Sequence, residues 1–356
     1  MGKLINYYGM GNTARGSVNF YQSIFQGLDK IYGLKGGTSS YKTQLLKKLS
    51  ENYSKNYNVD VINSSIDLNK IEGIIVKDLS LAIVDLTPIH GVKPINDKVK
   101  ILEIDLSKAE NKNILKINSL NLNALKKSFN DNIKRATKEY EKALEIHDIW
   151  ETFYISNMDF KRANELTLEI MEKIIPKDKL RDSLGLTYDR YLGAATSTGS
   201  RDYVMNLTDG LKRYFIKGRP GTGKSTILKK IASKLVEKGY DIEMYHCGFD
   251  PNSLDMVICR ILNFAIFDST SPHEYFPDKD DDEVIDVYKE AVKEGTDEKY
   301  IKELNEIKKR YKNKVVAGTK YLALAKVIVD KIEAVYTKAF KEEEAEKIVK
   351  EYLKSI

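Results

Sequence analysis

One stretch of eight residues, 218–225, constrains this chain more than any other. It reads Gly-Arg-Pro-Gly-Thr-Gly-Lys-Ser and matches G-x-x-x-x-G-K-[ST] at every fixed position. The apolar run at 214–216 predicts a strand before it, and residues 226–232 repeat apolar side chains at helical spacing after it. A strand, a glycine-rich turn and a helix in this order indicate a phosphate-binding P-loop.

The residues of this loop have separate chemical roles. Glycine adopts backbone conformations closed to residues with a Cβ, so the loop can turn successive N–H groups toward a polyphosphate. Lys224 is expected to reach the β and γ phosphates, and the Ser225 hydroxyl to join the shell of Mg²⁺. The predicted nucleotide-binding residues are Gly218, Arg219, Pro220, Gly221, Thr222, Gly223, Lys224, Ser225 and Thr226.

A second acidic element follows the loop. Residues 241–247 and 261–268 predict two more strands, and the second ends on Asp268. An aspartate at the tip of a buried strand can orient Mg²⁺ opposite a P-loop, so Ser225 and Asp268 are the predicted magnesium ligands. The alternative for Asp268 is a cap on the following turn.

The residue that would activate water is missing from its usual place. Many P-loop hydrolases place Glu directly after this aspartate, but here the next residue is Ser269. His273, Glu274 and Asp250 lie just past the strand ends and are the candidates, each with a structural alternative as a loop or turn residue. The predicted catalytic set is therefore Lys224, Asp268, His273, Glu274 and Asp250.

The chain also contains an internal repeat. Residues 57–90 align without a gap to residues 240–273, an offset of 183, and 10 of the 34 paired positions are identical. The first copy of the loop, residues 36–43, keeps Lys42 and Thr43, but Tyr41 replaces the last glycine. We expect Tyr41 to be strained at positive φ and to crowd the phosphates, leaving a site that binds nucleotide weakly or not at all. A remodelled site for another anion is the alternative, because Lys42, Thr43 and Asp85 remain.

Charged helical segments follow each copy, roughly at 124–175 and 281–356. Residues 143–154 align to 325–336 at an offset of 182, which pairs Asp148 with Asp330 and Glu151 with Glu333. These segments predict a helical hairpin or lid on each core, or helices that pack between the two repeats, which we favour over an external partner.

Composition limits the other classes of function. The 58 Lys and Arg residues against 52 Asp and Glu give a net charge of +6 with the signs interspersed, which does not favour nucleic-acid binding. No apolar stretch approaches the roughly 20 residues that span a bilayer, and the amino terminus lacks a signal-peptide core. A cytoplasmic protein without a membrane segment is expected.

Four segments together carry a resemblance to a family: residues 193–196, the loop at 218–225, residues 245–251 and residues 267–275. With these segments and the duplication, the chain resembles the uncharacterised tandem P-loop ATPase proteins of bacteria over nearly its whole length. The resemblance implies ATPase or nucleotide kinase activity without naming a substrate. The first-copy loop departs from the family pattern at Ser39 and Tyr41, which puts a first ATP site in doubt.

The sequence thus predicts an α/β fold of two tandem P-loop NTPase domains, 1–180 and 181–356. Each is a mostly parallel sheet flanked by helices, with an α-helical extension. The predicted function is ATP binding and Mg²⁺-dependent hydrolysis at the second loop, with ATP favoured because no Asn-Lys-x-Asp run follows that loop. A kinase for a small molecule or nucleotide and a non-catalytic nucleotide-gated switch are the alternatives.

Overall fold

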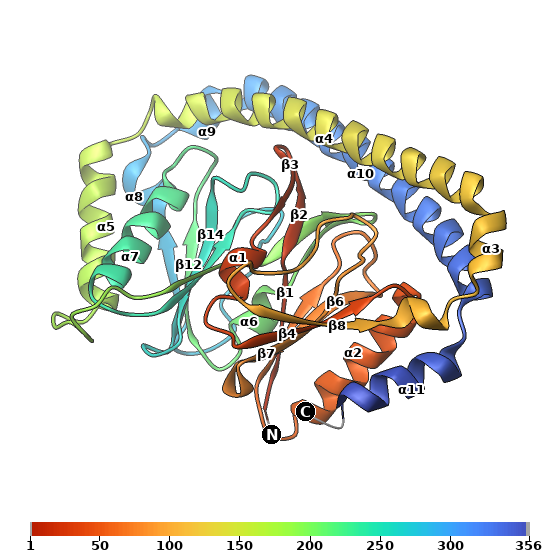
Figure 1. The fold of residues 1–356 in the computed structure, drawn as a ribbon. Helices are drawn as coiled ribbons and strands as arrows, with labels where there is room; N and C mark the ends of the chain where they lie inside the picture. Colours follow the sequence, from red (N-terminus) through yellow and green to blue (C-terminus); the bar gives the residue numbers. More distant parts are fainter. Residues whose placement is uncertain (1, 354–356) are drawn as a thin grey trace.

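The computed structural model describes residues 2–353, and its two halves contain the same series of elements (Figure 1). The strands of the first half are β1 (Leu4–Tyr8), β2 (Met10–Thr13), β3 (Gly16–Asn19), β4 (Lys30–Lys35), β5 (Val59–Asn63), β6 (Ile71–Val76), β7 (Leu81–Asp85) and β8 (Lys100–Asp105). Those of the second half are β9 (Thr187–Tyr191), β10 (Gly193–Thr196), β11 (Gly199–Asp202), β12 (Lys212–Lys217), β13 (Ile242–His246), β14 (Leu254–Cys259), β15 (Phe264–Asp268) and β16 (Glu283–Asp286).

The helices repeat in the same way. The first half contributes α1 (Tyr21–Ile24), α2 (Ser39–Tyr53), α3 (Lys112–Ile117), α4 (Ser119–Ile155) and α5 (Phe160–Ile174), with 3₁₀ turns at Lys77–Leu79 and Leu106–Ala109. The second contributes α6 (Val204–Leu207), α7 (Lys224–Glu237), α8 (Val287–Ala291), α9 (Thr296–Lys299), α10 (Ile301–Ala339) and α11 (Glu342–Leu353).

Both halves share one sheet of 12 strands, in the order β16-β12-β15-β14-β13-β9-β1-β5-β6-β7-β4-β8. The two halves meet at its centre, where β1 and β9 are antiparallel and Tyr8 pairs with Tyr191. Within each half of this sheet the strands run in one direction except β6 or β14, which pairs antiparallel with both neighbours; β2–β3 and β10–β11 form separate antiparallel pairs. The predicted α/β class with a mostly parallel sheet is therefore confirmed, and the order read outward from the centre is the same on both sides.

The strands and helix around the second loop form where the sequence predicts them. The apolar run at 214–216 lies in β12, and α7 buries Ile227, Leu228, Ile231 and Leu235 against the sheet. The predicted strand at 261–268 begins only at Phe264, because Asn263 takes a left-handed turn with φ of 54°. The buried run Leu254–Cys259, directly before this turn, forms β14, a strand that was not predicted from the sequence.

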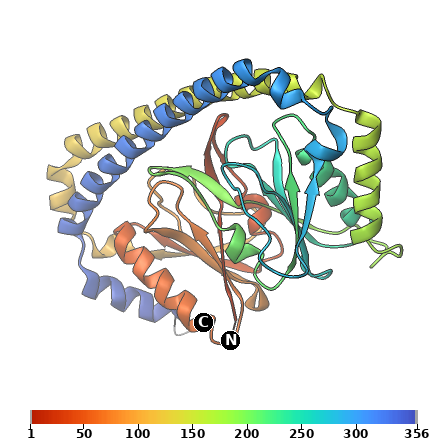
Figure 2. The ribbon, with the colours of Figure 1, turned by 180° about the vertical axis from the view of Figure 1, so that it is seen from behind.

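The two longest helices cross from one half to the other. Helices α4 and α10 lie side by side and antiparallel, with Tyr140 against Gly318 and Phe153 against Tyr300 (Figures 1 and 2). Beyond them, α5 packs on α7 and α8 of the second half, while α11 packs on the first half beside β8. The helical extension of each repeat therefore covers the core of the other repeat.

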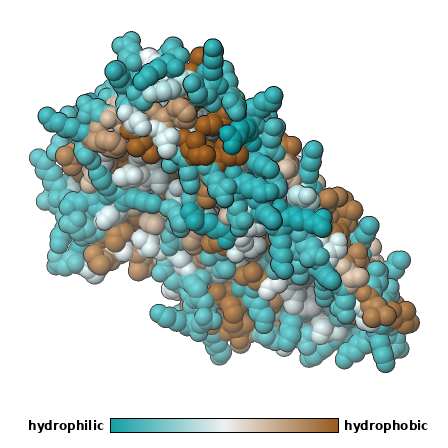
Figure 3. Space-filling model, turned by 90° about the horizontal axis from the view of Figure 1, so that it is seen from above, coloured by the Kyte–Doolittle hydropathy of each residue, from teal (hydrophilic) through white to brown (hydrophobic). Residues whose placement is uncertain are grey.

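This exchange bears on the expected domain organisation. Of the two predicted arrangements, the structure has helices packed between the repeats rather than a separate lid on each core. The predicted boundary between residues 180 and 181 falls between α5 and β9. The division of the chain into two domains at this point remains a prediction. On the face formed by the long helices, hydrophilic side chains dominate and apolar groups gather only in separate spots (Figure 3).

Candidate nucleotide site

The second P-loop connects β12 to α7 at the carboxyl edge of the sheet. Gly221 and Gly223 have φ of 78° and 83°, so the loop uses the left-handed region that glycine allows. Lys224 begins the helix and is nearly buried; its Nζ donates to the carbonyl oxygen of Arg219 at 2.9 Å and lies 3.6 Å from Asp268 Oδ2. The lysine and the strand-end aspartate that the sequence singled out therefore lie together.

The predicted magnesium ligands lie on two adjacent elements. Asp268 ends β15, which pairs in parallel with β12 beside the loop, and its Oδ1 accepts from the Thr270 amide at 3.0 Å. Ser225 lies in the first turn of α7, where its Oγ accepts from the Leu254 amide at 2.9 Å. A hydroxyl and a carboxylate are oxygen donors of the kind that Mg²⁺ takes, so both residues fit the ion. The bond from the Thr270 amide also fits the alternative role of Asp268, which is to cap the turn that follows β15.

The remaining loop residues shape the turn. The Arg219 guanidinium donates to Asp297 Oδ2 at 2.9 Å and lies over the Tyr288 ring, 4.7 Å from its centroid. Thr222 is buried, and its Oγ1 donates to the Arg219 carbonyl at 2.8 Å. Gly218 is buried, Pro220 is half-buried and Thr226 is exposed. The side chain of Arg219 is thus turned to the protein, and Lys224 and the loop amides other than that of Thr222, which donates to the Arg219 carbonyl, are the groups left for an anion.

The three residues predicted to position water lie near the loop but have other partners. His273 is buried, and its Nδ1 lies 2.7 Å from Asp202 Oδ2. Burial lowers the pKa of His273, but the bond to Asp202 and nearby carboxylates outweigh this and raise it. Glu274 is exposed, 4.0 Å from Lys217, and Asp250 accepts from Arg15 Nε at 2.7 Å. Their catalytic roles remain predictions.

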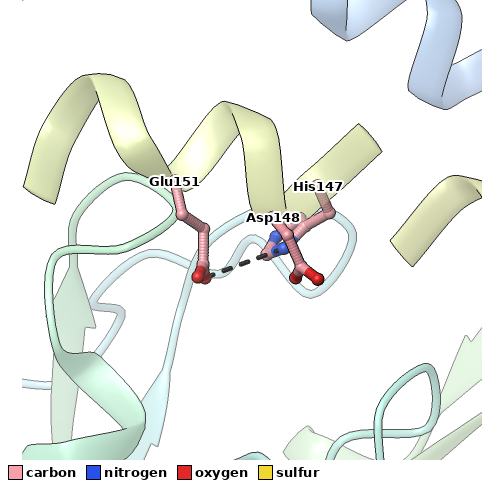
Figure 4. Close-up of side chains that lie close together, drawn as sticks. All are labelled: His147, Asp148 and Glu151. Carbon is pink, nitrogen blue, oxygen red and sulfur yellow. Dashed lines mark ion pairs between the residues drawn. The ribbon is translucent and has the colours of Figure 1, made fainter. Parts of the chain in front are cut away.

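Another group faces this loop from the other repeat. His147, Asp148 and Glu151 lie on α4 and point toward the loops of the second half (Figure 4). One ligand atom from each lies within 4.8 Å of the others, and His147 Nδ1 is 3.7 Å from Glu151 Oε1. Oxygen and imidazole ligands this close can hold a divalent cation, although exposed acids often lie together without one.

These three residues were not predicted as site residues from the sequence. Asp148 and Glu151 were recognised only as positions retained in the second repeat, on a helix expected to pack between the repeats. The structure places α4 directly on the loop: a Cβ on Gly221 would lie 2.8 Å from the Glu151 carbonyl oxygen. The one indication in the sequence was that the same residue type, Glu, occupies this position in both repeats. Nothing in the local sequence links residue 151 to residue 221.

The first-repeat loop differs from the prediction in one respect. Tyr41 is not at positive φ; it lies in α2, which begins at Ser39 with Thr38 as its N-cap, so the expected backbone strain is absent. The Tyr41 ring is buried against Phe340, with centroids 5.2 Å apart. The helix gains one turn at the expense of the loop, since Ser39 aligns with Gly221 of the intact loop.

The hydrogen-bonding groups of the first-repeat loop already have partners within the protein. Ser39 and Ser40 donate their amides to Glu333 at 3.1 and 2.6 Å, and Gly37 donates to Glu110 at 2.7 Å. Lys42 is 2% exposed, and its Nζ contacts Asp85 Oδ1 at 2.5 Å and Thr87 Oγ1 at 2.9 Å. The retained Thr43 accepts from the Ile71 amide at 3.3 Å, as Ser225 does from Leu254. Lys42, Thr43 and these loop amides are thus bonded to groups of the protein itself.

Comparisons with known proteins add one relative. The signal recognition particle receptor FtsY of Metamycoplasma hominis is 29% identical over 140 residues, which cover 36% of this chain and 39% of that protein. The chain thus matches well under half the length of this relative. No family model matches the chain, and no solved structure matches it. Membership of a tandem ATPase family remains a prediction.

The fold, the loop and this similarity define a class: an α/β protein with a P-loop of the nucleotide-binding kind. The similarity does not favour ATP over GTP. Among residues 2–353, no helix is long and apolar enough to cross a membrane.

Proposed function

We propose that the protein binds a nucleoside triphosphate with Mg²⁺ at the second P-loop and hydrolyses it. In this proposal the loop amides and Lys224 hold the phosphates, and Ser225 and Asp268 hold the ion. His273, Glu274 or Asp250 would position the water. Mg²⁺ would neutralise charge that develops on the phosphate oxygens. ATP remains the expected nucleotide on sequence grounds, and GTP is the direct competitor to test.

One observation carries the proposal. Lys224 Nζ contacts the Arg219 carbonyl and lies 3.6 Å from Asp268. Lys224 begins a helix, and the loop before this helix contains two glycines with positive φ. A lysine, a carboxylate and a helix N-terminus that meet in this way supply the groups a Mg²⁺-polyphosphate needs. The first repeat supports the asymmetry, because its equivalent amides are bonded to Glu333.

A nucleotide-gated switch is the second candidate, and Ser269 favours it. This residue follows Asp268, is fully buried, and exchanges hydrogen bonds with the backbone of Tyr275 through Oγ. The usual position of the catalytic glutamate is therefore closed to water. A kinase for a small molecule remains the third reading, in which an acceptor takes the place of the attacking water.

Phosphate release from Mg²⁺-ATP and Mg²⁺-GTP, measured on the intact chain and on Lys224→Ala, tests the proposal. Release is expected with the intact chain and is expected to vanish with Lys224→Ala and with EDTA. The matched control is Lys42→Ala, which is expected to lower stability but to preserve release wherever the protein remains folded. Binding without release would overturn hydrolysis in favour of the switch, and ADP formation only with an added acceptor would favour the kinase.

A further inference from the structure

The two loops are each covered by a glutamate at the same place in the repeat. Glu333 aligns with Glu151, and Ser39 aligns with Gly221, both at an offset of 182. In the first half, the Glu333 carboxylate accepts from the amides of Ser39 and Ser40 at the start of α2. A carboxylate bonded to helix N-terminal amides takes the place that a phosphate takes in a P-loop. The first half therefore contains its own anion.

Glu151 stands in the corresponding position over the intact loop. Its main chain lies against Gly221, where a Cβ would be 2.8 Å from the Glu151 carbonyl oxygen and 2.9 Å from its Cβ. Burial raises the pKa of Glu151, and the charges of Asp148 and Asp250 add to this, while Lys224 and the Gly221 amide oppose it. The Glu151 side chain points toward the loops of the second half (Figure 4), which places its charge beside the groups that a nucleotide would use.

We propose that Glu151 is a built-in competitor of the nucleotide: its carboxylate occupies the phosphate end of the second P-loop, and binding of a nucleoside triphosphate displaces it together with the end of α4. This inference rests on the proposed function, because it concerns regulation of the same site. The physical reason is charge. A polyphosphate and the Glu151 carboxylate cannot both lie at the Gly221 amide without strong repulsion in a partly buried site.

The displacement would reach the other half through the helices. Helix α4 continues without a break from Ser119 to Ile155 and packs along α10. The far end of α10 holds Glu333 on the first loop. A movement at residue 151 therefore changes the contact between two helices that cover both halves of the sheet. Trp150, the single tryptophan of the chain, lies beside Glu151 and packs on Tyr311 with centroids 6.0 Å apart.

The test is a titration of the full chain with the Mg²⁺ complex of a non-hydrolysable ATP or GTP analogue, read by Trp150 fluorescence and by calorimetry. Glu151→Gln keeps the shape of the side chain and removes the charge, so affinity is expected to rise about tenfold, with a smaller change in fluorescence on binding. The control is Glu145→Gln, which removes an exposed charge from the same helix, outside the group of His147, Asp148 and Glu151; its affinity is expected to change by less than about threefold.

Three results would overturn the inference. Weaker binding by Glu151→Gln would show that the carboxylate assists the nucleotide, for instance through a shared cation. Unchanged binding would show that Glu151 does not compete, and an equal gain in Glu145→Gln would show a general effect of charge. Binding that survives Lys224→Ala would instead overturn the proposed function, and no binding by either the intact chain or Glu151→Gln would overturn both.

Discussion

At the scale of single residues, burial sets the behaviour of the acids beside the second loop. Asp268 is accessible and lies next to Lys224, whereas Asp255 on β14 is 9% exposed and buried among apolar strands. Burial, chiefly, raises the pKa of Asp255 to about 6, against the opposing effect of His273. The aligned acid of the first repeat is Glu72, which lies 3.1 Å from His90. Each half thus has a buried acid and a buried histidine at aligned positions, Glu72 and His90 in the first and Asp255 and His273 in the second.

The raised pKa of Asp255 predicts a dependence of stability on pH. The folded pKa exceeds the unfolded value of about 3.9, so stability is highest below that value and falls as the pH rises through about 6. Asp255→Asn removes the ionisation. Its free energy of unfolding, relative to the intact chain, is expected to increase by about 2 kcal/mol between pH 4.5 and 7.5 in urea titrations. A difference that does not change with pH would contradict this account of Asp255.

The residues of the candidate site differ in how far the sequence could identify them. The fixed spacing of the loop places Lys224 and Ser225 without any knowledge of the fold, and the apolar run before Asp268 places that residue at a strand end. Glu151 could not be found in this way. It reaches the loop only because α4 crosses to the other half, and that crossing depends on contacts distant in the chain.

At the scale of elements, helix starts and strand ends were predictable where the signal was local. The helix after the intact loop was expected and begins at Lys224. In the first repeat the sequence suggested the same loop shape, but Ser39 and Ser40 can be helical where Gly221 and Thr222 are not, so α2 starts earlier. The strand β14 was missed because its apolar run is separated from the next by a turn without glycine or proline, at residues 260–263.

The crossing of α4 and α10 provides a test of element packing. Gly318 of α10 lies against Tyr140 of α4, and a Cβ at residue 318 would lie 2.3 Å from Tyr140 Cε1. In an exposed helix, Gly→Ala stabilises by about 1 kcal/mol. Here Gly318→Ala is expected to lower the melting temperature instead, because overpacking costs about 1–3 kcal/mol.

A second substitution separates the two effects at this crossing. Tyr140→Leu replaces the ring that meets residue 318 with a smaller side chain. Gly318→Ala is therefore expected to lower the free energy of unfolding less in that background. The measurement is a double-mutant cycle on the free energy of unfolding. Additive effects, or a higher melting temperature for Gly318→Ala alone, would show that the helices do not approach closely at Gly318.

At the scale of the whole molecule, one buried arginine joins the two halves of the sheet. Arg190 on β9 has an exposed fraction of 0%, with Nη2 3.1 Å from Asp60 and Nη1 3.7 Å from Glu243. These two acids occupy aligned positions of the repeats, at an offset of 183. The guanidinium also lies over the Tyr7 ring of β1, 4.3 Å from its centroid. The centre of the sheet therefore depends on a charge that only one repeat supplies.

Replacement of this arginine is expected to be strongly destabilising. Arg190→Met fills similar space but leaves Asp60 and Glu243 buried with less positive charge, and a loss of about 3 kcal/mol in the free energy of unfolding is expected. Removing the two acidic charges as well, with Asp60→Asn and Glu243→Gln, is expected to recover part of the loss. Urea unfolding checks both results, and an Arg190→Met chain as stable as the original would contradict this role.

The exchange of helices was the least predictable feature of the molecule. Sequence alignment detected the repeat and its helical extensions, but a helix with one apolar face can cover either core equally well by local pattern. The structure places α5 over the second half and α11 over the first. One intact loop and one loop occupied by Glu333 then face opposite ends of the same helical pair.

The number of nucleotides that each chain binds tests whether the second loop, and not the first, is a nucleotide site. Equilibrium dialysis of the full chain with the Mg²⁺ complexes of ATP and GTP analogues gives this number, with Lys224→Ala measured in parallel. We expect one nucleotide per intact chain and none for Lys224→Ala, because in the first loop the amides of Ser39 and Ser40 are bonded to Glu333 and Lys42 is paired with Asp85. Two nucleotides per chain, or binding that persists in Lys224→Ala, would contradict this expectation.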